Sequence, residues 1–160
     1  MKKNINDIIE KRRLELGYRD TEIAELIGLN ICWYCDIEWH EDELKTTVYL
    51  GIVKKLFKVL KLDFFEMVDM KCAFCELHEP FEQDYLLPRN ELIRKNRERL
   101  GMTRDELGVK VNFYEVAIEN MERKRNFLEE WSIDDILILA DALALPPQIL
   151  FDVKCEHCRR

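Results

Sequence analysis

The residues of this sequence whose type and spacing could do chemistry are six cysteines in three Cys-x-x-Cys pairs. The pairs are Cys32 with Cys35, Cys72 with Cys75, and Cys155 with Cys158. Outside the secretory pathway such pairs serve metal binding or redox chemistry rather than structural disulfides. A thioredoxin-like redox role needs a strand–helix–strand setting, and the chain has no alternating strand pattern of useful length. The pairs therefore favour a metal site.

Two of the pairs predict one zinc site with four thiolates, Cys72, Cys75, Cys155 and Cys158. Zinc prefers four thiolate or imidazole ligands in a tetrahedron, and the spacing within each pair suits it. The stretch between Cys75 and Cys155 is far longer than in a common zinc finger. Unligated thiols are therefore the alternative interpretation.

Other candidate ligands leave the composition of the site open. Cys32 and Cys35 could join Cys72 and Cys75 within the first half of the chain. The remaining candidates are two histidines, His78 and His157, which also read as plain polar residues.

An internal repeat defines the elements that must position these cysteines. The residues from Ile8 to Gly17 match those from Leu92 to Gly101 at a shift of 84 positions. After a one-residue change in a loop the shift becomes 83 and carries the pair at 72 and 75 onto the pair at 155 and 158. We therefore expect copy one in residues 1–75, a linker in 76–89 and copy two in 90–160.

Apolar periodicity and capping residues predict about five helices in each copy and no strands. In copy one we expect helices near 5–16, 20–27, 30–39, 47–61 and 63–68. In copy two we expect them near 90–100, 103–110, 114–122, 132–143 and 146–151. Symmetric packing of two such copies would bring their cysteine tails together.

The stretch from Asn90 to Arg125 gives the most specific local signal. Gly101 ends a first helix, and Thr103 with Glu106 forms a capping box that opens a second one. Asn112 interrupts this helix about two turns later, and a third helix follows. Two short helices around a tight turn, braced by a longer one, indicate a helix-turn-helix.

Both copies resemble the helix-turn-helix domains of the phage Cro/CI-repressor family, also called the Xre type. The residues that carry the resemblance in copy one are Leu16, Gly17, Ile23, Ala24, Ile27, Gly28, Leu29, Asn30 and Glu38. In copy two they are Leu100, Gly101, Leu107, Gly108, Val111, Asn112, Ile118, Glu122 and the segment 140–145. The resemblance implies an all-α tandem pair of five-helix lambda-repressor-like domains and a DNA-binding transcription regulator.

The family's pattern also implies where copy two would contact double-stranded DNA. Arg104, at the start of the second helix, would hold a phosphate, and Asn120 on the third helix would lie nearest the bases. Arg123, Lys124 and Arg125 follow the third helix and would add phosphate contacts. A single domain needs a second half-site, so DNA binding would require a homodimer or a partner protein.

Copy one is poorly suited to DNA, which suggests a second function. Its corresponding positions carry Asp20, Cys32 and Asp36, and residues 1–79 hold 12 basic against 16 acidic side chains. Trp33 and Trp39 lie on its third helix, where we expect a partner, the other copy or a second chain to cover them. The alternative is therefore a protein-interaction module, such as an antirepressor, that has lost base readout.

Composition excludes several other classes. The net charge of −7 makes general polyanion binding unfavourable, so any DNA contact must rest on a local patch. We find no apolar run long enough to span a membrane and no secretory signal, and we expect a cytoplasmic protein. No catalytic grouping or glycine-rich phosphate loop occurs, so we do not expect an enzyme.

Overall fold

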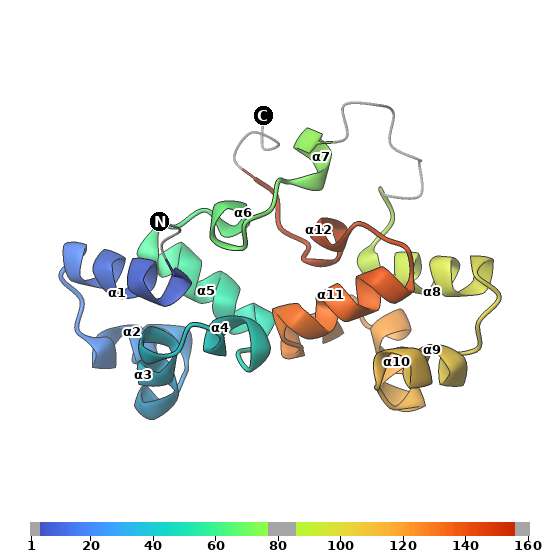
Figure 1. Cartoon of the computed structure of the whole chain (residues 1–160), viewed down its shortest axis with the longest axis horizontal. Helices are drawn as coiled ribbons and strands as arrows, with labels where there is room; N and C mark the ends of the chain where they lie inside the picture. Colours follow the sequence, from blue (N-terminus) through green and yellow to red (C-terminus); the bar gives the residue numbers. More distant parts are fainter. Residues whose placement is uncertain (1–3, 77–85, 156–160) are drawn as a thin grey trace.

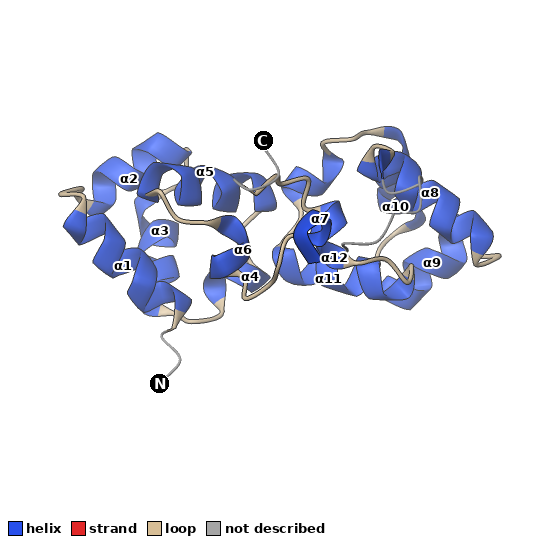
Figure 2. Ribbon diagram, turned by 90° about the horizontal axis from the view of Figure 1, so that it is seen from above, coloured by secondary structure: helices blue, strands red, loops and turns tan. Residues whose placement is uncertain are grey.

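A computed structural model describes residues 4–76 and 86–155, and within these ranges the chain is helical without strands (Figure 1, Figure 2). The predicted all-α class is therefore confirmed. Copy one contains α1 (Ile5–Glu15), α2 (Asp20–Ile27), α3 (Ile31–Trp39), α4 (Glu43–Thr46), α5 (Leu50–Leu60), α6 (Phe64–Met67) and α7 (Ala73–Glu76). Copy two contains α8 (Arg89–Arg99), α9 (Arg104–Val111), α10 (Glu115–Arg123), the 3₁₀ helix η2 (Phe127–Glu130), α11 (Ile133–Ala142) and α12 (Pro147–Leu150). None of these helices is long and apolar enough to cross a bilayer.

Most helix boundaries follow the capping residues. Thr103 and Glu106 form the predicted capping box, and the Ser132 hydroxyl accepts a hydrogen bond from the Asp135 amide at 3.2 Å. The predicted helix at 47–61 instead begins at Leu50, because Tyr49 is an extended N-cap residue that follows the separate short helix α4. Helices of one turn, such as α4 and η2, are too short to leave a periodic signal in the sequence.

Left-handed backbone recurs at the same positions of both copies. Each pair is separated by the 84- or 83-residue shift of the repeat, and the pairs are Gly17 and Gly101, Gly28 and Asn112, Lys61 and Ala144, and Asp69 and Asp152. Such residues end helices and turn the chain, and glycine or asparagine adopts this conformation most readily. The turns between the main helices therefore recur at corresponding positions of the two copies.

The same buried ion pair joins the first and third helices of each copy. Arg13 donates to Glu38 at 2.6 Å, and Arg97 donates to Glu122 at 2.5 Å. In each case another guanidinium nitrogen donates to a carbonyl oxygen in the turn before the second helix, with distances of 3.0 and 2.8 Å. The charges therefore have hydrogen-bond partners, as buried charges require.

The copies meet through matching elements in the middle of the molecule (Figure 1). Helix α5 contacts η2, and its counterpart α11 contacts α4, the counterpart of η2. Tyr49 and Ser132, the N-cap residues of α5 and α11, form an antiparallel bridge. The Leu50 amide donates to the Trp131 carbonyl at 2.8 Å. These contacts are reciprocal, as they would be around an approximate two-fold axis.

A charged cluster of three residues also crosses this interface. The Glu129 carboxylate accepts from Lys54 at 2.5 Å and from Arg89 at 2.8 Å. The Arg89 side chain is almost fully buried and also donates to the Leu150 carbonyl at 3.0 Å. Gly51 leaves room for this cluster, since a Cβ there would lie 3.3 Å from the Glu129 carbonyl oxygen.

We predict that Glu129→Gln destabilises the protein by about 3 kcal/mol, because it leaves two cations without their carboxylate in a partly dry interface. The measurement is the free energy of unfolding from a urea titration. Glu130→Gln is the matched control, since Glu130 is exposed, and we expect it to change stability by less than about 0.5 kcal/mol. Equal effects of both substitutions would contradict the role of Glu129.

Candidate functional site

Three thiols from the two copies meet at one point. The sulfur atoms of Cys72, Cys75 and Cys155 all lie within 4.8 Å of one another, and Cys75 Sγ is 3.4 Å from Cys155 Sγ. Cys72 and Cys155 are buried and Cys75 is half-buried. The convergence expected from the repeat is therefore present for these three residues, and the group could hold a metal ion.

Short helices and tight turns bring these thiols together. The left-handed residues Asp69 and Asp152 turn the chain after α6 and α12. The segments that follow these turns carry the cysteines that meet. The Phe64 and Phe151 rings pack across the copies with centroids 5.3 Å apart. The Cys75 amide donates to the Cys72 carbonyl at 3.0 Å, which curls the first pair around the site.

The remaining candidate ligands divide into two groups. Cys158, His78 and His157 lie outside the described residues. Cys32 and Cys35 lie on α3, on the opposite side of the molecule from α7 (Figure 1), so they do not join Cys72 and Cys75. The alternative of a site within copy one is therefore wrong.

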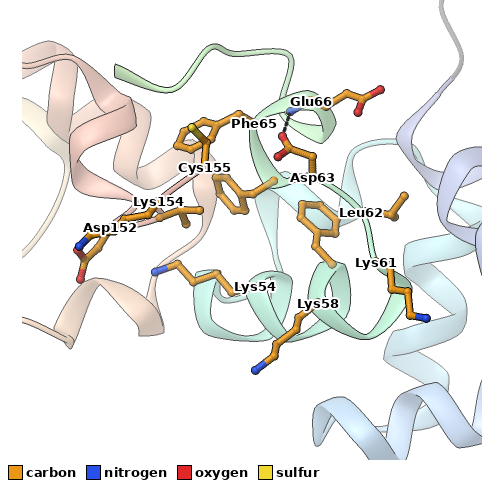
Figure 3. A pocket seen from close by; sticks show the side chains of 13 residues that line it. Lys54, Lys58, Lys61, Leu62, Asp63, Phe65, Glu66, Asp152, Lys154 and Cys155 are labelled. Atoms are coloured by element: carbon orange, nitrogen blue, oxygen red, sulfur yellow. Dashed lines mark hydrogen bonds between the residues drawn. The ribbon is translucent and has the colours of Figure 1, made fainter. Parts of the chain in front are cut away.

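A groove of about 810 Å³ adjoins the thiols and is lined by both copies (Figure 3). Its rim carries Lys54, Lys58, Lys61 and Lys154, which suggests an anion. The labelled lysines point in different directions, however, and Lys54 is hydrogen-bonded to Glu129. The groove therefore lacks the convergent cations that an anion site requires.

The third helix of copy one presents an apolar face to solvent. Asn30 caps α3 by accepting a hydrogen bond from the Cys32 amide at 2.8 Å. Tyr34 and Ile37 are buried, while Trp33 is 64% exposed and Trp39 is 71% exposed. Neither copy two nor any other described part of the chain covers these tryptophans, so an intramolecular cover is excluded within the described residues.

The Cys35 thiol of this helix lies in a negative electrostatic environment. Burial raises the pKa of the Cys35 thiol, and the negative charges of Asp20, Glu38 and Asp36 raise it further. These carboxylates therefore lie close enough to Cys35 for their field to act on it. A thiol with a raised pKa is a weak nucleophile at neutral pH, so the pair on α3 lacks the features of a redox centre.

In copy two, carboxylates already engage the arginines expected to hold phosphate. Arg104 donates to Glu122 at 2.7 Å and has Glu119 at 4.0 Å. Arg123 forms an ion pair with Glu119 at 2.8 Å, and Arg125 forms one with Asp152 at 3.2 Å. In each case the carboxylate offsets part of the positive charge that the guanidinium would offer to a phosphate.

The other two predicted DNA contacts are also engaged. The Asn120 side chain donates to the Val116 carbonyl of its own helix at 3.0 Å. The Lys124 amine lies 6.0 Å from the centroid of the Phe127 ring, at the outer limit of a cation–π contact. Asn120 is half-buried, and Lys124 is exposed.

Sequence reasoning missed the cluster of Lys54, Arg89 and Glu129 and the bond between Arg104 and Glu122. The cluster joins residues 75 and 40 positions apart, and no periodic pattern or motif reports such pairs. Arg104 was recognised as a cation, but its carboxylate lies on another helix. Only the three-dimensional arrangement identifies that partner.

Searches of protein families, of curated proteins and of solved structures found no significant match to this chain. The site must therefore be interpreted from its own residues.

We predict an acid-sensitive contribution of Glu122 to stability. Burial raises the pKa of Glu122, but the hydrogen bonds from Arg97 and Arg104 lower it more, and the result lies below the ordinary value of 4.5. Because its pKa is lowered, the ionised Glu122 carboxylate stabilises the fold above pH 4.5. This contribution is lost as the pH falls through the folded-state pKa. Glu122→Gln should therefore cost about 3 kcal/mol at pH 7 and much less near pH 3.

Urea titrations of both proteins across this pH range measure the difference. Glu115→Gln is the control, because Glu115 is exposed on the same helix, and its effect should be small at every pH. A Glu122→Gln effect that does not change with pH would refute the ionised pair.

Proposed function

We propose that this protein is a transcription regulator built from two linked helix-turn-helix domains, and that it acts by binding another protein rather than by reading DNA. The observation that carries the proposal is the surface of the third helices, which differs from the unpaired cationic and polar surface that DNA requires. Helix α3 exposes Trp33 and Trp39 among carboxylates. In copy two, Glu119 and Glu122 engage Arg104, and the arginines at the end of α10 are likewise paired.

The arrangement of the helices supports the helix-turn-helix part of the proposal. In each copy two short helices, α2 with α3 and α9 with α10, are joined by a turn that contains a left-handed Gly28 or Asn112. Both pairs lie on the same side of the molecule (Figure 1). Dimeric regulators of this type present two third helices in this way, and here a single chain supplies both.

The charge distribution argues against DNA as the ligand of this side. Residues 19–45 of copy one carry eight carboxylates and two cations, whereas the corresponding residues 103–129 of copy two carry six and five. DNA binding draws much of its affinity from cations that replace the counterions of phosphates. Copy one would instead repel the duplex wherever copy two approached it.

DNA binding by copy two is the second candidate, and one observation favours it. Arg123, Lys124 and Arg125 are exposed at the end of α10. Their carboxylate partners are partly solvated, and such surface ion pairs contribute little, so a phosphate could displace them. This candidate places the DNA on one copy only.

The two candidates are separated by a DNA titration with the full chain at low salt. We expect no binding below about 10 µM, and no change on Arg123→Ala with Arg125→Ala. Binding that weakens with salt, with a slope about 1 smaller for each arginine removed, would replace the proposal by the second candidate. Tyr114→Ala is the control, because Tyr114 is exposed beside α10 and carries no charge.

We further infer that the thiol group is a zinc site that fastens the two copies together. Tetrahedral zinc with bonds of about 2.3 Å holds its sulfur atoms about 3.8 Å apart, close to the spacing of Cys72, Cys75 and Cys155. Three thiolates leave one ligand position, which the repeat assigns to Cys158. Because the ligands come from both copies, zinc bound there would stabilise the contact between them.

We predict that the reduced protein contains about one zinc per chain and that a chelator lowers its midpoint of thermal unfolding. Free zinc at a hundred times its dissociation constant adds about 2.7 kcal/mol of stability. Cys75→Ser should abolish zinc binding measured by metal analysis, while Cys35→Ser should leave it unchanged. A zinc content near zero with freely titrating thiols would refute the site.

A further inference from the structure

The solvent side of α3 carries an apolar stripe beside Asp36. Each residue of a helix is rotated by about 100° from the one before, so Cys32, Cys35 and Trp39 share one side. This side faces away from the buried Tyr34 and Ile37. Trp39 lies on this side at 71% exposure. Trp33, at 64% exposure, lies about 100° around the helix from Cys32, and Asp36 lies between them.

Copy two shows that the fold does not need these tryptophans. The repeat places Trp33 on Ala117 and Trp39 on Arg123. The exposed Leu26 of α2 similarly falls on Lys110. The same helices fold in copy two with alanine or a cation at these positions. Ala117 is buried, but Lys110 and Arg123 are exposed, so apolar residues at positions 26 and 39 are not required by the packing of copy one.

The charges around the stripe indicate what covers it. The negative charges of Asp20 and Asp36 act on Cys35, and residues 41–43, which follow α3 after His40, are all acidic. Seven of the eight carboxylates between residues 19 and 45 remain after Glu38 is set aside as the partner of Arg13. The same stretch contains two cations, Arg19 and Lys45. An apolar surface with this rim complements a ligand that is apolar in the middle and cationic at its edges.

We propose that the α3 stripe binds a cationic amphipathic helix of a partner protein. This inference rests on the proposed function and adds the chemical character of the partner protein. An amphipathic helix meets such a surface with apolar side chains spaced three and four residues apart. Lysine or arginine at its borders reaches the carboxylates and lies over the indole rings, which attract cations. A second copy of this chain fits less well, because its own α3 face carries the same negative charge.

The probe is a fluorescent synthetic peptide of about 18 residues with leucine on one helical face and lysine and arginine on the other. It is titrated with the full chain at about 0.1 M salt, and binding is followed by anisotropy. We expect saturable binding with one peptide per chain. Trp33→Ala with Trp39→Ala should weaken it about tenfold or more, as loss of two aromatic anchors does. Asp36→Asn should weaken it less and reduce its dependence on salt.

The control variant is Tyr114→Ala with Val116→Ala, which removes exposed apolar side chains at the start of α10 and should leave binding unchanged. A thermal melt of each variant verifies that it is folded. The inference is overturned if the tryptophan variant binds equally well or if a peptide with glutamate in place of its cations binds as tightly. It is also overturned if sedimentation shows a dimer that the tryptophan variant dissociates.

The DNA titration described above tests the proposed function independently of this inference. A chain that binds neither peptide nor DNA refutes the cationic helix but leaves a different protein partner as the function. A chain that binds DNA through Arg123 and Arg125 refutes both.

Discussion

The buried ion pair between the first and third helix is the interaction on which each copy depends. A carboxylate removed from water needs more donors than one arginine supplies, and the two copies find the additional donor differently. In copy one the Tyr34 hydroxyl donates to Glu38 at 2.6 Å. In copy two the repeat places Ile118 at that position, and Arg104 donates to Glu122 instead.

The identity of this additional donor affects the surface at the start of the second helix in each copy. Because Arg104 donates to a buried carboxylate, the positive charge that it offers to a phosphate at the start of α9 is partly neutralised. In copy one the tyrosine leaves the corresponding position at the start of α2 unconstrained, and it is occupied by Asp20. The interior of each copy thus helps to decide what its second helix can offer to a ligand.

The linkage of two copies in one chain changes the energetics of their contact. Two separate domains would associate according to their concentration, whereas a linker of about a dozen residues keeps the partner at a high effective concentration. A small interface made by α5, η2, α11 and α4 can then suffice. The thiols of Cys72, Cys75 and Cys155 lie beside this interface, so a bound metal ion would close it at the end remote from α3 and α10 (Figure 1).

Local chemistry made much of this structure predictable. The repeat predicted two copies with matching turns, and Thr103 with Glu106 predicted a helix start. The convergence of the cysteines followed from the symmetry of the repeat, without any contact being visible in the sequence. Pairings such as Arg89 with Glu129 were not predictable, because charged residues are frequent and nothing local selects one partner among many.

The differences between the copies carry more information about function than their likeness. The repeat fixes what the fold needs: the buried arginine and glutamate, the left-handed turns and the apolar core. Exposed positions have diverged in opposite directions: at the end of α3 and just beyond it, Trp39, His40 and Glu41 stand where copy two has Arg123, Lys124 and Arg125. Divergence at these exposed positions changes the chemistry of the surface and leaves the scaffold intact. Copy one therefore combines the helical scaffold that it shares with copy two with an acidic and aromatic surface where copy two is basic.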